Sequence, residues 1–238
     1  MDSPRQLLPD ASGWRQLWAR VRTLWRVKMA ANILGMGAFF AAYFWVLHHP
    51  QFRVIVMPLI PLDRWIAFEP AALPLYASLW LYASLPLALL TSRRELVSYG
   101  WASLALSAIG LTLFLLVPTS VPEAGIDWAR HPSIAFLKAV DVGDNACPSL
   151  HVAFAVFSAV WLARQLRELR ADAALQALNA AWCIGILYST LATRQHVVLD
   201  VLAGALLGLL VVGLQLWALD RPPSAARSRA TEAIGTAI

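Results

Sequence analysis

The chain has 238 residues, of which 59% are hydrophobic and only 14% are charged. Soluble domains carry about 25% charged and roughly 45–50% apolar residues, so this composition excludes a water-soluble globule and a disordered chain. The formal charge of +5 is compatible with nucleic acid, an anionic membrane surface or an anionic substrate. Cys147 and Cys183 are too few and too far apart for a disulfide scaffold or a metal knuckle.

Residues 1–28 precede the first apolar stretch and are rich in tryptophan and arginine. Apolar residues recur there at helical spacing with arginines between them: Trp14, Leu17, Trp18, Val21, Leu24 and Trp25. This pattern predicts an amphipathic helix that lies on an anionic leaflet. A helix packed against the rest of the protein is the alternative interpretation. We do not expect the apolar stretch that follows to be a cleaved signal peptide, because some 28 residues precede it and it ends without a small-residue cleavage site.

Six apolar stretches follow, each close to the roughly 20 residues that a helix needs to cross a membrane. They span residues 29–47, 71–90, 99–117, 148–163, 173–191 and 197–219. We therefore predict an all-α integral membrane protein whose catalytic domain, residues 29–219, is one bundle of six transmembrane helices. Residues 220–238 are expected to form a flexible cytoplasmic tail.

The positions of Lys and Arg predict the orientation. If the six stretches cross the membrane in turn, fourteen of the nineteen basic residues lie on the side of the two termini. By the positive-inside rule both termini are then cytoplasmic, and we expect a bacterial inner-membrane protein with its active site facing the periplasm. The basic charge belongs to membrane topology, so membrane lipids are expected partners and nucleic acid is not. All five histidines fall on the outer side.

The connection between the third and fourth stretches, residues 118–147, is unusually long. Most connections in compact domains have about 4–6 residues, and long ones are usually functional or disordered. This one contains prolines, aromatic residues and charges of both signs. We therefore expect a structured loop that covers the outer face of the bundle.

The loop leads into Pro148, Ser149 and His151 at the start of the fourth stretch. Proline suits the first turn of a helix, so the free N–H groups there point into the outer interface with the positive end of the helix dipole. Such a helix start is a ready phosphate site. Ser149 adds a hydroxyl donor and His151 a titratable one.

His196 and Asp200 are four residues apart at the start of the last stretch. On a helix such residues share a face, and a carboxylate in this position can orient the imidazole and raise the basicity of its other nitrogen. An ionisable residue inside an apolar segment is by default functional. The charge count places this pair on the same side as Ser149 and His151, so the four residues are predicted to form one active site.

At these residues the chain resembles the membrane-bound type 2 phosphatidic acid phosphatase superfamily and, within it, the inositol phosphorylceramide synthase-like branch. The resemblance covers the six-helix layout and, in detail, residues 118–208. Residues 147–151 occupy the position of the superfamily's Pro-Ser-Gly-His motif, with Leu150 in place of glycine, and residues 196–200 match its closing His-x-x-x-Asp. The usual first motif, Lys with Arg-Pro seven residues later, is absent, and Ser189-Thr190 lacks the arginine of the usual Ser-Arg pair.

The resemblance implies a metal-independent lipid phosphatase or phosphotransferase without a cofactor. His196 would be the nucleophile that forms a phosphohistidine, and Asp200 would orient it. His151 would be the general acid for the leaving alcohol and then the general base for the acceptor, which is water or another alcohol. Hydrolysis and head-group transfer are both compatible with the motifs.

The phosphate would be bound by Ser149 and by substitutes for the missing cations, namely Arg194, Arg130 and Lys138 in that order. The alternative function is a polytopic transporter or proton relay that uses the His/Asp cluster. That alternative predicts further polar residues through the membrane, yet residues 201–207 contain no ionisable group.

Overall fold

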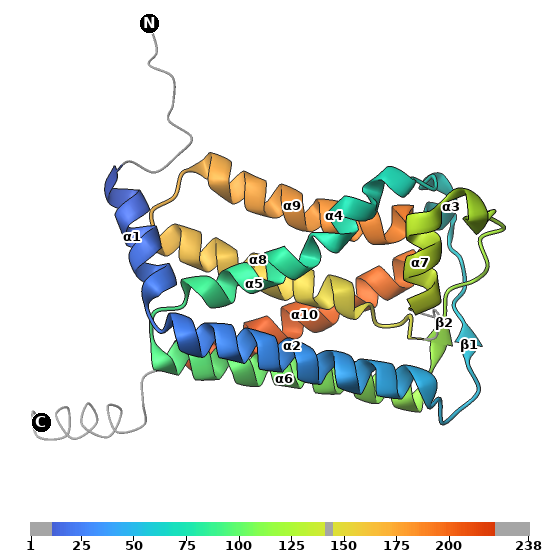
Figure 1. Cartoon of the computed structure of the whole chain (residues 1–238), viewed down its shortest axis with the longest axis horizontal. Helices are drawn as coiled ribbons and strands as arrows, with labels where there is room; N and C mark the ends of the chain where they lie inside the picture. Colours follow the sequence, from blue (N-terminus) through green and yellow to red (C-terminus); the bar gives the residue numbers. More distant parts are fainter. Residues whose placement is uncertain (1–10, 141–144, 222–238) are drawn as a thin grey trace, which may run out of the picture.

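The computed structural model describes residues 11–140 and 145–221. Long helices run side by side along the molecule (Figure 1). At one end of this bundle lies the short helix α1 (Ala11–Arg22), and at the other lie two short strands, β1 (Ile55–Val56) and β2 (Thr119–Ser120). We refer to these as the α1 end and the strand end.

Within the described residues, five helical segments are long and apolar enough to cross a membrane. They are α2 (Trp25–His48), the segment Pro70–Leu89, α6 (Arg93–Leu116), α9 (Ala173–Ala192) and α10 (Val198–Leu219). The second of them is divided into the short helix η1 (Pro70–Ala72), α4 (Leu73–Ala77) and α5 (Leu79–Leu89). These apolar segments identify an integral membrane protein.

The fourth predicted crossing corresponds to α8 (Leu150–Glu168), which is not among the five. Its hydropathy is lowered by polar residues at both ends, His151 at the start and Arg164 and Arg167 at the finish. The helix nevertheless lies inside the bundle, packed against α5, α9 and α10. By length and composition the structure supports five crossings, and a sixth through α8 stays a prediction.

Helices α8 and α10 approach each other closely because two glycines of α10 face the α8 backbone. A Cβ atom on Gly204 would overlap the carbonyl oxygen of Ser149, and one on Gly208 would overlap that of Ala153. Small residues four apart permit such close approach of membrane helices. The contact brings the start of α8 against the first turn of α10, where the Ser149 amide donates to the Asp200 carbonyl (3.0 Å).

The predicted N-terminal amphipathic helix is represented by α1, which a turn at Thr23 and Leu24 separates from α2. Leu17 packs against the apolar core of the bundle, whereas Trp18 is 61% exposed. Helix α1 therefore contacts the bundle as the alternative interpretation expected, and its position on a leaflet stays a prediction. Residues 1–10 and 222–238 lie outside the described residues.

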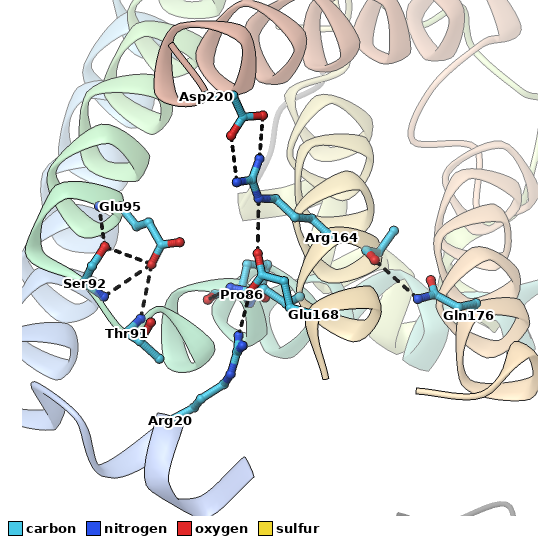
Figure 2. A network of polar contacts seen from close by, with 11 residues as sticks. Arg20, Pro86, Thr91, Ser92, Glu95, Arg164, Glu168, Gln176 and Asp220 are labelled. Atoms are coloured by element: carbon cyan, nitrogen blue, oxygen red, sulfur yellow. Dashed lines mark hydrogen bonds and ion pairs between the residues drawn. The ribbon is translucent and has the colours of Figure 1, made fainter. Parts of the chain in front are cut away.

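Polar contacts fasten α1 to the bundle (Figure 2). Arg20 pairs with Glu168 at the end of α8 (3.0 Å), and Glu168 also pairs with Arg164 (3.3 Å). Arg164 in turn donates two hydrogen bonds to Asp220, just after α10 (2.9 and 2.8 Å). These contacts join α1, α8 and α10 at the end of the bundle opposite the strands.

The strand end is built from the connections between helices. Strands β1 and β2 pair in parallel, Ile55 with Thr119, and Thr119 also bridges Asn145. Three short helices complete this end: α3 (Pro61–Trp65), η2 (Trp128–Arg130) and α7 (Pro132–Val140). The described parts of the long loop are therefore folded over the bundle, and Asp141 and Asp144 lie outside them.

Candidate active site

Ser149 is the N-cap residue of α8. Its hydroxyl oxygen accepts a hydrogen bond from the Val152 amide (3.3 Å), and the residue is fully buried. Because a serine hydroxyl can accept and donate at the same time, its own proton is available for a second oxygen. The N-terminal turn that it caps also carries His151.

His151 is held between aromatic rings of the neighbouring helical segment. Its ring stacks on Tyr76 of α4, with centroids 4.0 Å apart, and meets the edge of Trp80 of α5 at 6.1 Å. The ring is buried, and its Nε2 atom has no hydrogen-bond partner among the described residues. Sequence reasoning did not identify the two aromatic partners, because they lie in an apolar stretch without any motif.

His196 lies in the turn before α10, and Asp200 lies in the first turn of that helix. Nδ1 of His196 is 3.5 Å from Oδ2 of the fully buried Asp200, which is longer than an ordinary hydrogen bond. The same Oδ2 accepts the Val197 amide (3.0 Å), so Asp200 also caps α10. The carboxylate is thus fixed with one oxygen toward the imidazole, as the four-residue spacing predicted.

Cys147 is a further neighbour of Asp200 that sequence reasoning assigned no role. Burial, together with the Asp200 carboxylate beside it, raises the pKa of the Cys147 thiol to about 11. The thiol therefore stays protonated at neutral pH. The shift shows that Cys147, at the end of the long loop, lies near the first turn of α10.

Two cavities meet at His196. The first, which we call the loop cavity, has a volume of about 640 Å³ and is lined by residues 120–126 of the long loop together with Lys138 and Gln195. The second, the aromatic cavity, has a volume of about 140 Å³ and lies among the long helices. Its lining is mainly aromatic and includes Phe39, Phe40, Tyr43, Tyr76, Trp80 and Phe154.

His196 and Asn145 line both cavities, and His151 lines the aromatic one. The structure thus brings the two predicted histidines to one shared space, although one lies in α8 and the other in the turn before α10. Asn145 was not predicted as a site residue. Its proximity depends on the bridge to Thr119, which no local pattern indicates.

The three predicted phosphate-binding cations have different surroundings. Lys138 lines the loop cavity and donates to the Arg194 carbonyl (3.1 Å). Arg130 has an 82% exposed side chain paired with Asp127 (3.2 Å). The Arg194 guanidinium donates to the carbonyls of Asp63 (3.2 Å) and Ile66 (2.7 Å). Of the three, Lys138 is brought to the cavity of His196.

Asp63 holds the turn that carries His196 and was missed by sequence reasoning. The residue is buried; its Oδ1 accepts the Val198 amide and its Oδ2 accepts the Ile60 amide, both at 2.8 Å. Asp63 therefore caps α10 from 135 residues away. Together with the two hydrogen bonds from Arg194, these contacts hold residues 194–198 against residues 60–66. The sequence signal for such a cap is weak because it depends on a long-range contact.

The described part of the chain contains no group of three or more His, Cys, Asp or Glu side chains arranged to hold a metal ion.

Searches among curated proteins and among solved structures gave no significant match. A family model of the PAP2 superfamily matches residues 95–222, which is more than half of the chain and includes the segments of both histidines. The chain therefore belongs to the PAP2 superfamily.

Proposed function

We propose that the protein is an integral-membrane, metal-independent enzyme that breaks a phosphoester bond of a membrane lipid through a phosphohistidine on His196. Membership of the PAP2 superfamily indicates a phosphatase or phosphotransferase of lipid phosphates. The observation that carries the proposal is the meeting of a loop-lined and an aromatic cavity at this histidine.

A lipid phosphate has two parts that match these two cavities. The aromatic cavity lies among apolar helices and suits a hydrocarbon chain, for which each buried CH₂ contributes about 0.8 kcal/mol. The loop cavity is within the roughly 300–1,000 Å³ typical of small-molecule sites and suits a polar head group. A substrate spanning both would place its phosphorus near His196.

In the first step, Nε2 of His196 attacks the phosphorus atom. The N–P bond forms while the P–O bond to the leaving alcohol breaks, and His151 donates a proton to the departing oxygen. Asp200 faces Nδ1 and stabilises the positive charge that develops on the ring. The distance of 3.5 Å between these groups is expected to shorten when the transition state forms, as is common in catalytic pairs.

In the second step, the oxygen of water or of an acceptor alcohol attacks the phosphohistidine. The N–P bond breaks, the new P–O bond forms, and His151 takes the proton of the acceptor, which restores both histidines. Phosphoryl transfer depends chiefly on positioning and charge stabilisation. The Ser149 hydroxyl and the Lys138 ammonium are the proposed donors to the phosphoryl oxygens.

Within the superfamily, we assign the chain to the inositol phosphorylceramide synthase-like branch, whose reaction is head-group transfer. Leu150 in place of glycine and the missing motif cations support this assignment. The volume of the loop cavity also leaves room for an acceptor alcohol beside the phosphate. The proposed setting is a bacterial inner membrane with both termini in the cytoplasm and the site facing the periplasm.

Turnover of a lipid phosphate with a radiolabelled phosphorus atom tests the proposal. The purified protein in liposomes is expected to yield an acid-labile phosphoprotein that is absent from H196A. Persistence of this species and of turnover in H196A would overturn the assignment of the nucleophile. Assays with and without inositol or another alcohol separate the two reactions: free phosphate alone excludes transfer, and head-group exchange alone excludes hydrolysis.

A further inference from the structure

The side chain of Asn145 is a buried amide whose donor is unused within the described part of the chain. The residue is 7% exposed, and its Nδ2 atom has no hydrogen-bond partner among the described residues. Buried polar atoms are almost always paired, because leaving one unpaired costs free energy. Nδ2 of Asn145 is one of six such atoms among the described residues. It lies beside the nucleophile, since Asn145 and His196 are the two residues that line both cavities.

The position of Asn145 is fixed from two sides. Thr119 of β2 forms a β-bridge with Asn145. The Thr119 carbonyl accepts the Ala146 amide (3.0 Å), and the Thr119 hydroxyl accepts the Cys147 amide (2.8 Å). Cys147 in turn lies near the Asp200 carboxylate. The backbone that carries the Asn145 amide is therefore held against the same frame that positions His196.

The charged residues near His196 provide little net positive charge to bind a phosphate, so hydrogen-bond donors are needed. Of the residues that the structure describes, two charged ones line the loop cavity, Lys138 and Glu123, and their charges are opposite. Arg130 is paired with Asp127, and the Arg194 guanidinium is engaged with backbone carbonyls. A phosphate at His196 would therefore depend on hydrogen bonds from neutral groups more than on cations.

We propose that the Asn145 amide donates a hydrogen bond through Nδ2 to a non-bridging oxygen of the phosphoryl group during its transfer to and from His196. This inference rests on the proposed function. The neutral amide would take over part of the phosphate binding that the resemblance assigns to the Lys and Arg of the first motif, which this chain lacks. The bond is made when the phosphoryl oxygens become equatorial, so it stabilises the transition state more than the bound substrate.

The test compares N145A and N145D with wild-type protein in liposomes. Removing one preorganised donor to a transition-state oxyanion lowers kcat by about 10²–10³-fold, and we expect this loss in N145A with little change in KM. N145D should lose at least as much, because its carboxylate repels the phosphate. Orthovanadate, a mimic of the five-coordinate phosphorus, should inhibit N145A more weakly by a similar factor.

Thermal unfolding in detergent distinguishes this role from a structural one. Because Nδ2 of Asn145 makes no hydrogen bond within the described residues, N145A should unfold at the wild-type temperature or above, although its turnover falls. Loss of stability and activity together, or turnover within threefold of wild type, would overturn the inference. N32A is the control. Asn32 lies outside both cavities, and its amide, unlike that of Asn145, donates to the Ser84 hydroxyl (3.3 Å); N32A should keep full turnover.

Failure of the inference and failure of the proposed function give different results. If wild-type protein forms no phosphohistidine and turns over no lipid phosphate, the proposed function fails. If wild-type protein forms the intermediate on His196 and N145A forms and hydrolyses it at the wild-type rate, the function stands and the role of Asn145 is refuted.

Discussion

The carboxylate of Asp200 connects three parts of the chain at a single residue. It faces Nδ1 of His196 (3.5 Å), accepts the amide of Val197 (3.0 Å) and raises the pKa of the nearby Cys147 thiol. The first contact orients the proposed nucleophile, and the second caps α10. A change at Asp200 is therefore expected to disturb the position of His196 as well as its charge.

Cys147 can be used to report on the charge of Asp200. Burial and the neighbouring carboxylate raise the pKa of its thiol to about 11, and only the thiolate reacts with alkylating agents. With Cys183 replaced by alanine, Cys147 is the remaining cysteine, and its alkylation by iodoacetamide should stay slow near pH 8 and accelerate toward about pH 11. D200N removes the charge, so the pKa should fall and alkylation near pH 8 should become several-fold faster.

The rates are measured by mass spectrometry of the intact protein in detergent. Alkylation in the unfolded state supplies the control, since an unperturbed thiol has a pKa of about 8.5. Equal rates for D200N and the parent protein would show that the thiol does not sense the carboxylate.

Single residues also show where sequence reasoning succeeded and where it could not. Spacing indicated that His196 and Asp200 share one face of a helix. The structure has the two side chains facing each other (3.5 Å), although His196 precedes the N-cap residue of α10. Arg194 was placed first among the phosphate cations, yet its guanidinium binds carbonyls 131 and 128 residues away. Contacts over such separations have no local pattern, which is also why Asp63 and Asn145 were missed.

At the scale of elements, each apolar stretch corresponds to a helical segment, and polar residues explain where the observed helix ends differ from the predicted ones. Helix α6 begins at Arg93, six residues before the predicted stretch, because Ser92 and Glu95 form a capping box that supports a polar first turn. Helix α8 falls outside the five candidate crossings because polar residues occupy both of its ends. Hydropathy alone therefore located the ends of α9 and α10 to within one residue, but not the start of α6 or the end of α8.

The packing of α8 on α10 is tested by adding one methyl group. In G204A the new Cβ would overlap the Ser149 carbonyl, so the helices must separate and the start of α8 must move away from Asp200. We expect a loss of about 1–3 kcal/mol in unfolding free energy, typical of overpacking, together with a clear loss of lipid phosphate turnover.

G213A is the control on the same helix, because nothing lies within 4 Å of a Cβ at Gly213. Alanine there should leave activity unchanged and stabilise the helix slightly, since glycine is about 1 kcal/mol less favourable in a helix interior. Thermal unfolding in detergent and turnover are measured for both variants. A G204A protein as stable and active as G213A would contradict the close contact.

At the scale of the whole molecule, the two ends of the bundle differ in chemistry. The α1 end carries an ion-pair network of arginines and carboxylates that includes Arg164 and Asp220, in which the Arg164 guanidinium lowers the pKa of the Asp220 carboxyl (Figure 2). The strand end carries the loop cavity and His196. In a membrane, such an arrangement would place the network at one surface and the site at the other.

The excess of Lys and Arg on the side of the termini predicts which surface is cytoplasmic. Two single-cysteine variants, each in a background with Cys147 and Cys183 replaced by alanine, test this. Ala129→Cys lies at the strand end in an exposed turn of η2, and Ala174→Cys lies in the exposed first turn of α9, at the α1 end. In intact bacterial cells, a membrane-impermeant maleimide should label the first variant and reach the second only after lysis. Labelling in the opposite order would show that the protein has the opposite orientation in the membrane, with the site open to the cytoplasm.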